Sequence, residues 1–263
     1  MKRTEVIIFG INGRLGSAIS LCSGDGFTVA AGVSNSVSVK SEVSVCGRRV
    51  PVYPSGAIPP EFAKNRTVVD ASTPAGTETA VAISAKAQSP LIVATTGHDA
   101  RQQSEIRVAS EYIPIVMDSN FSRGMAMLRN LLPSLFPAPE GFDISILERH
   151  RAMKKDSPSG TAMQLAGRIS SICGGMRIKT ENGPRIHGDM EIVSIRAGSA
   201  AGSEHRIFLH DSFEELELRH TVTDSRAYAD GIVHAAKWLN ERERMPGLYS
   251  MRDTIALNSA VQG

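Results

Sequence analysis

The fold is decided by the stretch Glu5-Val6-Ile7-Ile8-Phe9-Gly10-Ile11-Asn12-Gly13-Arg14-Leu15-Gly16, in which an apolar run passes directly into glycines with the spacing GxxGxxG. The run has the β-branched composition of a buried strand, and the residues after Gly13 have a helical pattern. Glycines at such a turn let the backbone approach a ligand closely, so that the first amides of the helix can bind a pyrophosphate. The stretch therefore predicts the strand, turn and helix that begin a dinucleotide-binding domain.

Further short apolar runs continue this alternation of strand and helix to about residue 121. Such a pattern is typical of a parallel sheet covered by crossover helices. The expected strands are Glu5–Phe9, Phe27–Val33, Thr67–Asp70, Leu91–Ala94 and Ile113–Met117, and a helix is expected at Thr77–Ala87. We predict an α/β, Rossmann-like domain.

The pattern changes after Phe121. A helical stretch over Gly124–Leu132 leads into longer strands, in which apolar and polar residues alternate as they do when one face is buried and the other is wet. These expected strands are Asp143–Glu148, Met190–Arg196, Arg206–Leu209 and Glu214–Val222. We predict a second, α+β domain with a mixed or antiparallel sheet.

The last helical pattern, Ala227–Leu239, places four apolar residues on one stripe, so this helix can pack on the first domain. We therefore predict that residues 1–121, completed by residues 227–263, form the dinucleotide-binding domain. Residues 122–226 are predicted to form the second domain.

The composition restricts the classes of function. The 263 residues include 29 lysines and arginines against 27 aspartates and glutamates, which is not the charge balance of a protein that binds nucleic acid or anionic membranes. No stretch approaches the roughly 18 apolar residues needed to cross a bilayer, and Val6–Phe9 is too short for a signal-peptide core. We expect a soluble, cytoplasmic protein that binds neither nucleic acid nor membrane.

The cysteines and histidines do not suggest a metal site. The chain has three cysteines without a CxxC pair, and several of its histidines are scattered without the spacing of metal ligands. We expect neither a disulfide framework nor a bound metal. The residues concerned are Cys22, Cys46, Cys173, His98, His205, His210 and His220.

The predicted cofactor site extends from the glycine-rich turn to the ends of later strands. Ligands of open α/β sheets lie beyond the carboxyl ends of the strands, so the loops that follow these strands should line the nicotinamide half of the site. Arg14 can add a charged contact to phosphate or can remain a solvated arginine at the helix start. The assigned residues are Gly10, Asn12, Gly13, Arg14, Leu15, Gly16, Ser34, Thr95, Thr96, Gly97, Asn120, Phe121 and Ser122.

The end of the second strand bears on the choice of coenzyme. It reads Gly32-Val33-Ser34-Asn35-Ser36 and lacks the acidic residue that usually binds the adenosine ribose hydroxyls. A small polar residue at this position tolerates a 2′-phosphate, which Lys40 is close enough in sequence to neutralise. We predict NADPH or NADH as the cofactor, with NADPH favoured.

A second group of chemically active residues lies in the stretch Glu148-Arg149-His150-Arg151-Ala152-Met153-Lys154-Lys155-Asp156-Ser157-Pro158-Ser159-Gly160-Thr161-Ala162. Its Ser-Gly-Thr turn opens a predicted helix, Ala162–Ile169, whose first amides can bind a carboxylate. Lys154 can neutralise a substrate charge, and His150 can donate a proton near neutral pH. Taken separately, the histidine can also be structural, and the turn can be no more than a helix cap.

This stretch resembles the signature of the dihydrodipicolinate reductase family, E-x-H-H-x-x-K-x-D-x-P-S-G-T-A. Matches to other family motifs extend over nearly the whole chain: GINGRLG at residues 10–16 is similar to GxxGRMG, ATTG at 94–97 to GTTG, and SNFSRG at 119–124 to P-N-F-S-x-G. Later matches are Arg196-Ala197-Gly198, Gly202-Ser203-Glu204-His205, His220, Ser225-Arg226, Gly247-Leu248-Tyr249 and Met251-Arg252-Asp253.

The resemblance implies a function and a set of roles. It implies reduction of 4-hydroxy-tetrahydrodipicolinate, or dihydrodipicolinate, to tetrahydrodipicolinate in the diaminopimelate and lysine pathway, with NAD(P)H as hydride donor. His150 is then the general acid, and Lys154 binds or polarises the substrate. Ser159, Gly160 and Thr161 are expected to hold one carboxylate of this cyclic dicarboxylate. The second domain is expected to bind substrate and to form a homotetramer.

Two residues depart from the family pattern, and two rival functions stay open. Arg151 replaces the family's second histidine; it can bind a carboxylate but cannot act as a neutral imidazole. Asp118 replaces a small or apolar residue, and it can repel an anionic ligand or face away from it. The rivals are another dehydrogenase of amino-acid precursors, which does not need the KxDxPSGTA motif, and a non-catalytic NAD(P)-binding redox sensor.

Overall fold

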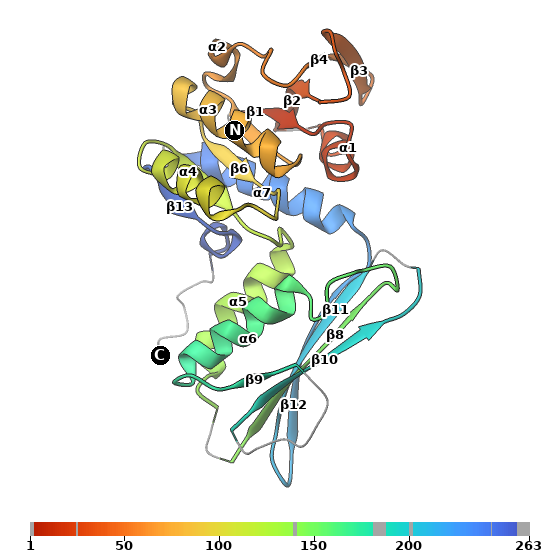
Figure 1. Cartoon of the computed structure of the whole chain (residues 1–263), viewed down its shortest axis with the longest axis vertical. Helices are drawn as coiled ribbons and strands as arrows, with labels where there is room; N and C mark the ends of the chain where they lie inside the picture. The colour runs from red at the N-terminus through yellow and green to blue at the C-terminus, as the bar shows by residue number, and fades with distance from the viewer. Residues whose placement is uncertain are drawn as a thin grey trace. The chain divides into compact units, whose positions relative to one another are not determined.

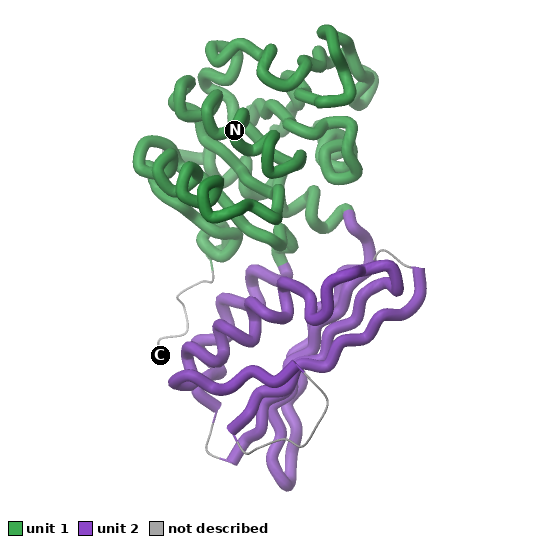
Figure 2. Tube along the Cα trace, viewed as in Figure 1, with its two compact units in different colours: residues 1–123, 226–256 green, residues 124–225, 257–263 purple. Residues whose placement is uncertain are grey.

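The computed structural model describes residues 3–24, 26–138, 141–180, 188–199, 202–242 and 244–256. The chain divides into two compact units, shown in green and purple in Figure 2. The first unit comprises residues 1–123 and 226–256, and the second is built from residues 124–225. Part of the predicted C-terminal segment, residues 257–263, lies outside the described residues.

The first unit contains a largely parallel sheet (Figure 1). Only the hairpin of β3 and β4 is antiparallel among its described strand pairs. The strand order reverses at β1, which pairs with β2 on one side and β5 on the other. In order across the sheet, the strands are β13 (Gly247–Tyr249), β7 (Pro114–Met117), β6 (Leu91–Val93), β5 (Thr67–Asp70), β1 (Thr4–Phe9), β2 (Phe27–Val33), β4 (Arg48–Tyr53) and β3 (Ser41–Val45).

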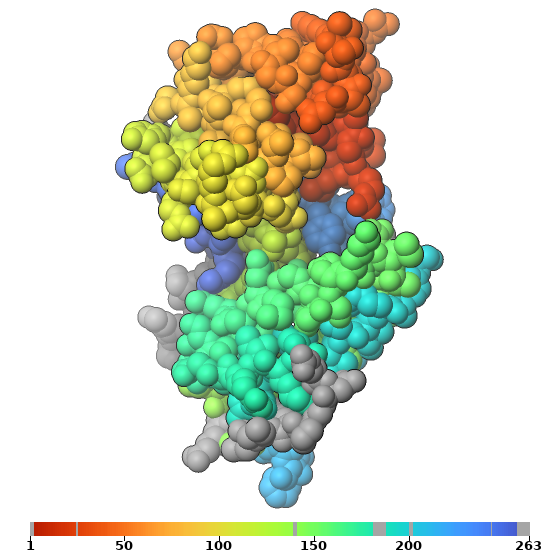
Figure 3. Space-filling view, viewed as in Figure 1, coloured from red at the N-terminus to blue at the C-terminus, as the bar shows by residue number. Residues whose placement is uncertain are grey.

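Helices cover this sheet. α7 (Arg226–Glu241) packs on β1, β5 and β6 and also contacts α1 (Arg14–Leu21). α3 (Pro74–Ala87) packs on β5 and β6 and contacts α2 (Pro60–Ala63) and α4 (Ala100–Ser110). In Figure 3 the side chains of α3 and α4 hide the strands beneath them. A short 3-10 helix, η1 (Met251–Thr254), follows β13.

Strand β1 explains why the sheet is buried on both faces. Ile7 and Phe9 belong to a core cluster that also contains Ala80 and Ile83 of α3. Neighbouring side chains of a strand point to opposite faces, so Ile8 lies on the other face, and it too is fully buried. This burial on both sides accounts for the continuous apolar run.

The second unit contains a mixed sheet. β8 (Asp143–His150) is parallel to β10 (Met190–Arg196) and antiparallel to β11 (Ser203–His210). β9 (Ile178–Lys179) extends one edge of the sheet, and β12 (Glu215–Val222) extends the other. The mixed sheet confirms the predicted fold class.

One face of this second sheet is covered by helices. Leu132 of α5 (Arg123–Leu135) and Leu165 of α6 (Gly160–Ile172) belong to a buried cluster with Ile146 of β8 and Ile207 of β11. The opposite face carries Val193, which is 44% exposed. The helices therefore leave apolar side chains exposed on one face of the sheet.

The predicted elements are present, and several others were not predicted. The hairpin of β3 and β4, helix α4, and strands β9 and β13 are additional. Strand β8 continues two residues past the predicted end at Glu148 and ends at His150. Within the described ranges, no helix has the length and apolar content required to cross a membrane.

Candidate functional site

The glycine-rich turn depends on close backbone approach. Gly10 has a φ of +79°, and a Cβ atom placed on it would lie 2.4 Å from the carbonyl oxygen of Ala71. A Cβ atom on Gly16 would lie 2.2 Å from the carbonyl oxygen of Gly10. Larger residues at these two positions would push the turn away from β5 or from the start of α1.

The start of α1 is available to an anion. Gly13 is its N-cap and provides no side-chain acceptor, and the first turn contains no acidic residue. The amides of the first turn, at Arg14, Leu15 and Gly16, have no partners within the helix because they precede its first hydrogen-bonded turn. Together with the helix dipole, these amides suit the pyrophosphate of a dinucleotide.

A cavity of about 260 Å³ lies beside this turn, at the carboxyl ends of β1, β2 and β5. Gly10, Asn12, Gly13 and Ser34, four of the predicted cofactor residues, line it. Thr73, which follows β5, lines it as well. The cavity thus lies where the strand order reverses, which is the usual ligand position of such sheets.

Hydroxyl and amide groups form the wall of this cavity at the end of β2. The Asn12 amide donates to the hydroxyl groups of Ser34 at 3.3 Å and Ser36 at 3.2 Å. The cavity lining includes no carboxylate. Nearby, the Ser34 amide donates to the carbonyl of Tyr53, and Lys40 Nζ lies 4.9 Å from the centre of the Tyr53 ring.

A buried carboxylate connects the loops that follow β5 and β6. Asp70, which is fully buried, accepts hydrogen bonds from the hydroxyl groups of Ser72 and Thr77. The Ser72 amide donates to Thr95 Oγ1 at 3.0 Å, and Thr77 Oγ1 lies 2.8 Å from His98 Nε2. Burial raises the pKa of Asp70, and the hydroxyl hydrogen bonds oppose this effect. Thr95 is buried within this network, whereas Thr96 and Gly97 are exposed in the loop.

The loop after β7 is held by its own polar groups. Asn120, Phe121 and Ser122 are buried, and Asn120 Oδ1 accepts from the Ser122 amide at 2.9 Å. Asp118 accepts from the amides of Asn120 at 3.1 Å and Met251 at 3.2 Å. Asp118 therefore connects this loop to η1, which accounts for a carboxylate at this position.

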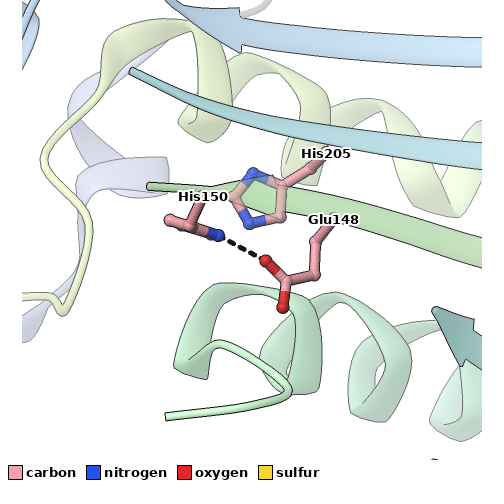
Figure 4. Close-up of side chains that lie close together, drawn as sticks. All are labelled: Glu148, His150 and His205. Atoms are coloured by element: carbon pink, nitrogen blue, oxygen red, sulfur yellow. Dashed lines mark hydrogen bonds and ion pairs between the residues drawn. The ribbon is translucent and has the colours of Figure 1, made fainter. Parts of the chain in front are cut away.

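In the second unit, the end of β8 presents an imidazole and a carboxylate on one face. His150 Nδ1 makes a short hydrogen bond to Glu148 Oε2 (Figure 4). The Glu148 side chain is completely buried, and that of His150 is 14% exposed. The ring of His205 meets the His150 ring edge to face, with centroids 5.3 Å apart.

The other oxygen of Glu148 faces different donors. Glu148 Oε1 accepts from Arg196 Nη2 at 2.6 Å and from the Ser159 amide at 3.2 Å. Burial opposes ionisation of Glu148, but hydrogen bonds from His150 and Arg196 outweigh it and lower the pKa of Glu148 to about 2. Glu148 is therefore ionised near neutral pH.

His205 is held as a neutral ring. Its Nε2 lies 3.3 Å from the Ser159 hydroxyl. Burial, followed by the charge of His150, lowers the pKa of His205 to about 3. His205 therefore places an uncharged imidazole beside His150.

The start of α6 is capped by a serine and lies next to the loop that contains Lys154. Ser159 is the N-cap, and its hydroxyl accepts from the Ala162 amide at 3.2 Å, while Gly160 and Thr161 begin the helix. Lys154 Nζ lies 2.8 Å from Asp156 Oδ1. A hydrogen bond from Lys154, together with one from the Gly160 amide, lowers the pKa of Asp156.

Arg151 lies in the same loop, between β8 and α6. Its side chain is exposed, and its carbonyl accepts from the Lys154 amide at 3.1 Å. His150 ends β8, and Arg151 and Lys154 lie in the loop between this strand and α6. Gly160 and Thr161 begin α6 there, and the Gly160 amide donates to the Asp156 carboxylate, so their role in binding a substrate carboxylate stays a prediction.

Three residues of this site were not assigned a function from the sequence: Glu148, Arg196 and His205. All three belong to matched motifs, but only strand pairing shows that they meet. Arg196 is opposite His150, and His205 is opposite Glu148 in the register of the sheet.

Glu148, His150 and His205 also form the one group among the described residues that could offer three metal ligands, whose atoms lie within 4.8 Å of one another. Both oxygens of Glu148 already accept hydrogen bonds, one of them from a guanidinium. We therefore interpret Glu148 and His150 as a hydrogen-bonded carboxylate–imidazole pair and do not interpret the group as a metal site.

Comparison with known proteins gives one family for both units. The family description "Dihydrodipicolinate reductase, N-terminus" matches residues 4–121, and "Dihydrodipicolinate reductase, C-terminus" matches residues 124–255. The two matches together cover most of the chain.

Individual relatives are similar over nearly their whole length. The 4-hydroxy-tetrahydrodipicolinate reductase of Sulfurimonas denitrificans is 31% identical, covering 96% of this chain and 99% of its own. That of Campylobacter lari is 32% identical, with 95% and 98% covered. A dipicolinate-bound dihydrodipicolinate reductase from a Paenisporosarcina species has the same fold, with a TM-score of 0.73 at 18% identity over 96% of this chain and 100% of its own.

Proposed function

The chain belongs to the dihydrodipicolinate reductase family, and we propose that it reduces 4-hydroxy-tetrahydrodipicolinate to tetrahydrodipicolinate in the diaminopimelate and lysine pathway. It is an NAD(P)H-dependent oxidoreductase. The observation that carries the proposal is the Glu148–His150 pair beside the start of α6, because it combines a proton donor with a carboxylate site.

The substrate carboxylates have suitable partners in the second unit. Lys154 and the Gly160 amide hold a carboxylate, that of Asp156. We infer that a substrate carboxylate takes this place, with the Thr161 amide and the Ser159 hydroxyl beside it. The exposed Arg151 supplies a second cation for a dicarboxylate, in a role that needs a charge and no neutral imidazole.

The proton comes from His150. Its Nδ1 is directed to Glu148, so Nε2 is the atom left to donate a proton to the substrate. The ionised Glu148 accepts from Nδ1 and holds the ring in place for this donation. His150 therefore acts as the general acid.

The first unit fits a nicotinamide dinucleotide. When bound, NAD(P)H supplies the hydride. The chain's own contribution is to bind and orient it: the uncapped amides of α1 for the pyrophosphate, Ser34 for the adenosine ribose, and the loops at Thr95–Gly97 and Asn120–Ser122 for the nicotinamide half. Asp70 fixes the first of these loops through Ser72.

The end of β2 favours NADPH. Ser34 and Ser36 carry hydroxyl groups where an acidic residue would repel a 2′-phosphate. Lys40 is held near Tyr53, whose carbonyl binds the amide of Ser34, so a cation is within this region. We propose that NADPH binds more tightly than NADH and that NADH is still accepted.

We also propose that the open face of the second sheet forms the contacts of a homotetramer. Val193 and Ile195 are exposed on this face, beside the half-buried Leu147 and Phe208. Glu204, with a side chain 2% exposed, is surrounded there by arginines. Apolar faces of this kind are commonly covered by another subunit. The cytoplasmic location stays a prediction.

The experiment that tests the reductase activity is the oxidation of NADPH and of NADH at 340 nm by the purified chain, with freshly generated product of dihydrodipicolinate synthase. We expect turnover with both coenzymes and a lower KM for NADPH. Tight NADPH binding without turnover would instead support the redox-sensor function. A lower KM for NADH would contradict only the coenzyme preference.

A further inference from the structure

We propose that Glu148 is a positioning residue whose single buried carboxylate fixes the proton donor His150 and the carboxylate-binding start of α6 relative to each other. The inference rests on the proposed role of His150 as the general acid. It adds the group that selects which ring nitrogen of His150 delivers the proton.

The two oxygens of Glu148 have separate partners. Oε2 meets His150 Nδ1, whereas Oε1 accepts from the Ser159 amide at 3.2 Å and from Arg196 Nη2 at 2.6 Å. Ser159 is the N-cap of α6, so the carboxylate contacts both the acid and the helix start. Because the Glu148 side chain is fully buried, water does not compete for these hydrogen bonds.

Arg196 extends the same connection to the loop between β8 and α6. Its Nη2 also donates to the carbonyl of Asp156 at 2.6 Å, two residues from Lys154. The guanidinium thus neutralises Glu148 and holds the segment that carries the predicted substrate cation. The buried ion pair of Glu148 and Arg196 therefore contacts three parts of the site. These are the proton donor His150, the loop that contains Lys154, and the start of α6.

The carboxylate determines the protonation pattern of His150. A carboxylate can only accept, so Nδ1 must carry a hydrogen and the proton that is transferred must come from Nε2. The ionisable groups around the pair are Arg196 on β10, His205 on β11, His220 on β12 and Arg129 on α5. In the adjoining loop, Lys154 and Asp156 pair with each other.

Glutamine cannot replace this carboxylate. Three donors, His150 Nδ1, the Ser159 amide and Arg196, converge on the two oxygens of Glu148. The amide of glutamine has one oxygen and one NH₂ group, so it must direct the NH₂ group at one of these donors. If it faces His150, the ring adopts the opposite tautomer. If the NH₂ group faces the Ser159 amide and Arg196, the hydrogen bond that holds the start of α6 is lost. In both cases, His150 loses the carboxylate that faces its Nδ1.

The test is the pH dependence of kcat and of kcat/KM for Glu148→Gln with saturating NADPH. The acid must be protonated to act, so activity declines at high pH. We expect this decline to move to lower pH in the variant, because the carboxylate that accepts from His150 Nδ1 is lost. At its optimum, kcat should fall about 100-fold or more. A decline at the wild-type pH would overturn the proposal.

Two further variants separate the possible failures. Asp189→Asn breaks another buried carboxylate–arginine pair of the second unit, in which Arg177 donates at 2.8 and 2.6 Å, and it should keep the wild-type pH profile. His150→Gln should lose activity at every pH. If His150→Gln is fully active, the proposed function of His150 fails. If it is inactive while Glu148→Gln follows the wild-type profile, only the role of Glu148 fails.

A measurement on the unaltered chain applies if Glu148→Gln does not fold. In protein labelled with ¹⁵N-histidine, the His150 signals are identified by their loss in His150→Gln. Above the pH at which activity declines, we expect Nδ1 to be protonated and Nε2 to be bare. The opposite tautomer would overturn the proposal.

Discussion

At the scale of single residues, the contact between Glu148 and His150 follows from the geometry of a strand. Glu148 and His150 are two positions apart on β8, so their side chains point to the same face. The two-residue spacing is visible in the sequence. The contact was nevertheless not predicted, because the expected strand ended at Glu148 and did not include His150. The contributions of Arg196 and His205 could not be predicted, because they depend on the register between strands that are distant in sequence.

Buried His205 makes a prediction about stability and pH. Burial, and then the charge of His150, lower its pKa to about 3 from an ordinary value of 6.5. Between these values, the unfolded chain binds a proton that the folded chain does not. The stability that depends on this difference is fully present above pH 6.5 and is lost as the pH falls. From this group alone, the free energy of unfolding should fall by about 1.4 kcal/mol per pH unit between roughly pH 6 and pH 4.

Urea unfolding at a series of pH values measures this slope. In His205→Gln, residue 205 cannot titrate. The free energy of unfolding should therefore change less steeply with pH, by the contribution of one proton. Equal slopes in wild type and His205→Gln would show that the folded ring titrates as it does in the unfolded chain.

At the scale of elements, the strands with strong apolar character were predictable and the polar elements were not. β2, β5 and β10 have the predicted bounds, because their sequences are apolar or alternate regularly. Helix α4 lacks an apolar stripe, so apolar periodicity did not predict it. The start of the helix could nevertheless have been recognised from its capping residues. Asp99 and Gln102 form a capping box, with Asp99 accepting from the Gln102 amide at 2.8 Å.

The glycine-rich turn gives the prediction at this scale. In Gly16→Ala, the new methyl group would lie 2.2 Å from a backbone oxygen of Gly10, so the turn must move. We expect the Kd for NADPH to rise about 10-fold or more, because the phosphate-binding amides move with the turn. The free energy of unfolding should fall by about 1 to 3 kcal/mol. Fluorescence titration with NADPH and urea unfolding measure the two effects.

Gly167→Ala is the matched control. Gly167 lies within α6 and has open space where a methyl group would be placed. This substitution should leave NADPH binding unchanged and raise stability by up to about 1 kcal/mol. Wild-type affinity for NADPH in Gly16→Ala would mean that close packing of this turn is not required for binding.

At the scale of the whole molecule, the sequence predicted two kinds of fold and a chemical role for each. The α/β class of the first unit and the mixed sheet of the second are confirmed, and the family matches cover both units. The roles of individual residues remain proposals. Composition excluded other classes of function but could not identify the substrate, which came from motifs placed at strand ends and helix starts.

The central claim is that this chain is a reductase in which His150 supplies the proton. The measurement that tests it most directly is kcat for wild type and for His150→Gln, with NADPH and freshly generated 4-hydroxy-tetrahydrodipicolinate. His234→Gln serves as control, since His234 contacts the Thr254 carbonyl in the first unit. We predict turnover by wild type and the control, and a kcat lower by about 100-fold or more in His150→Gln with unchanged NADPH binding. Wild-type turnover in His150→Gln would contradict the account.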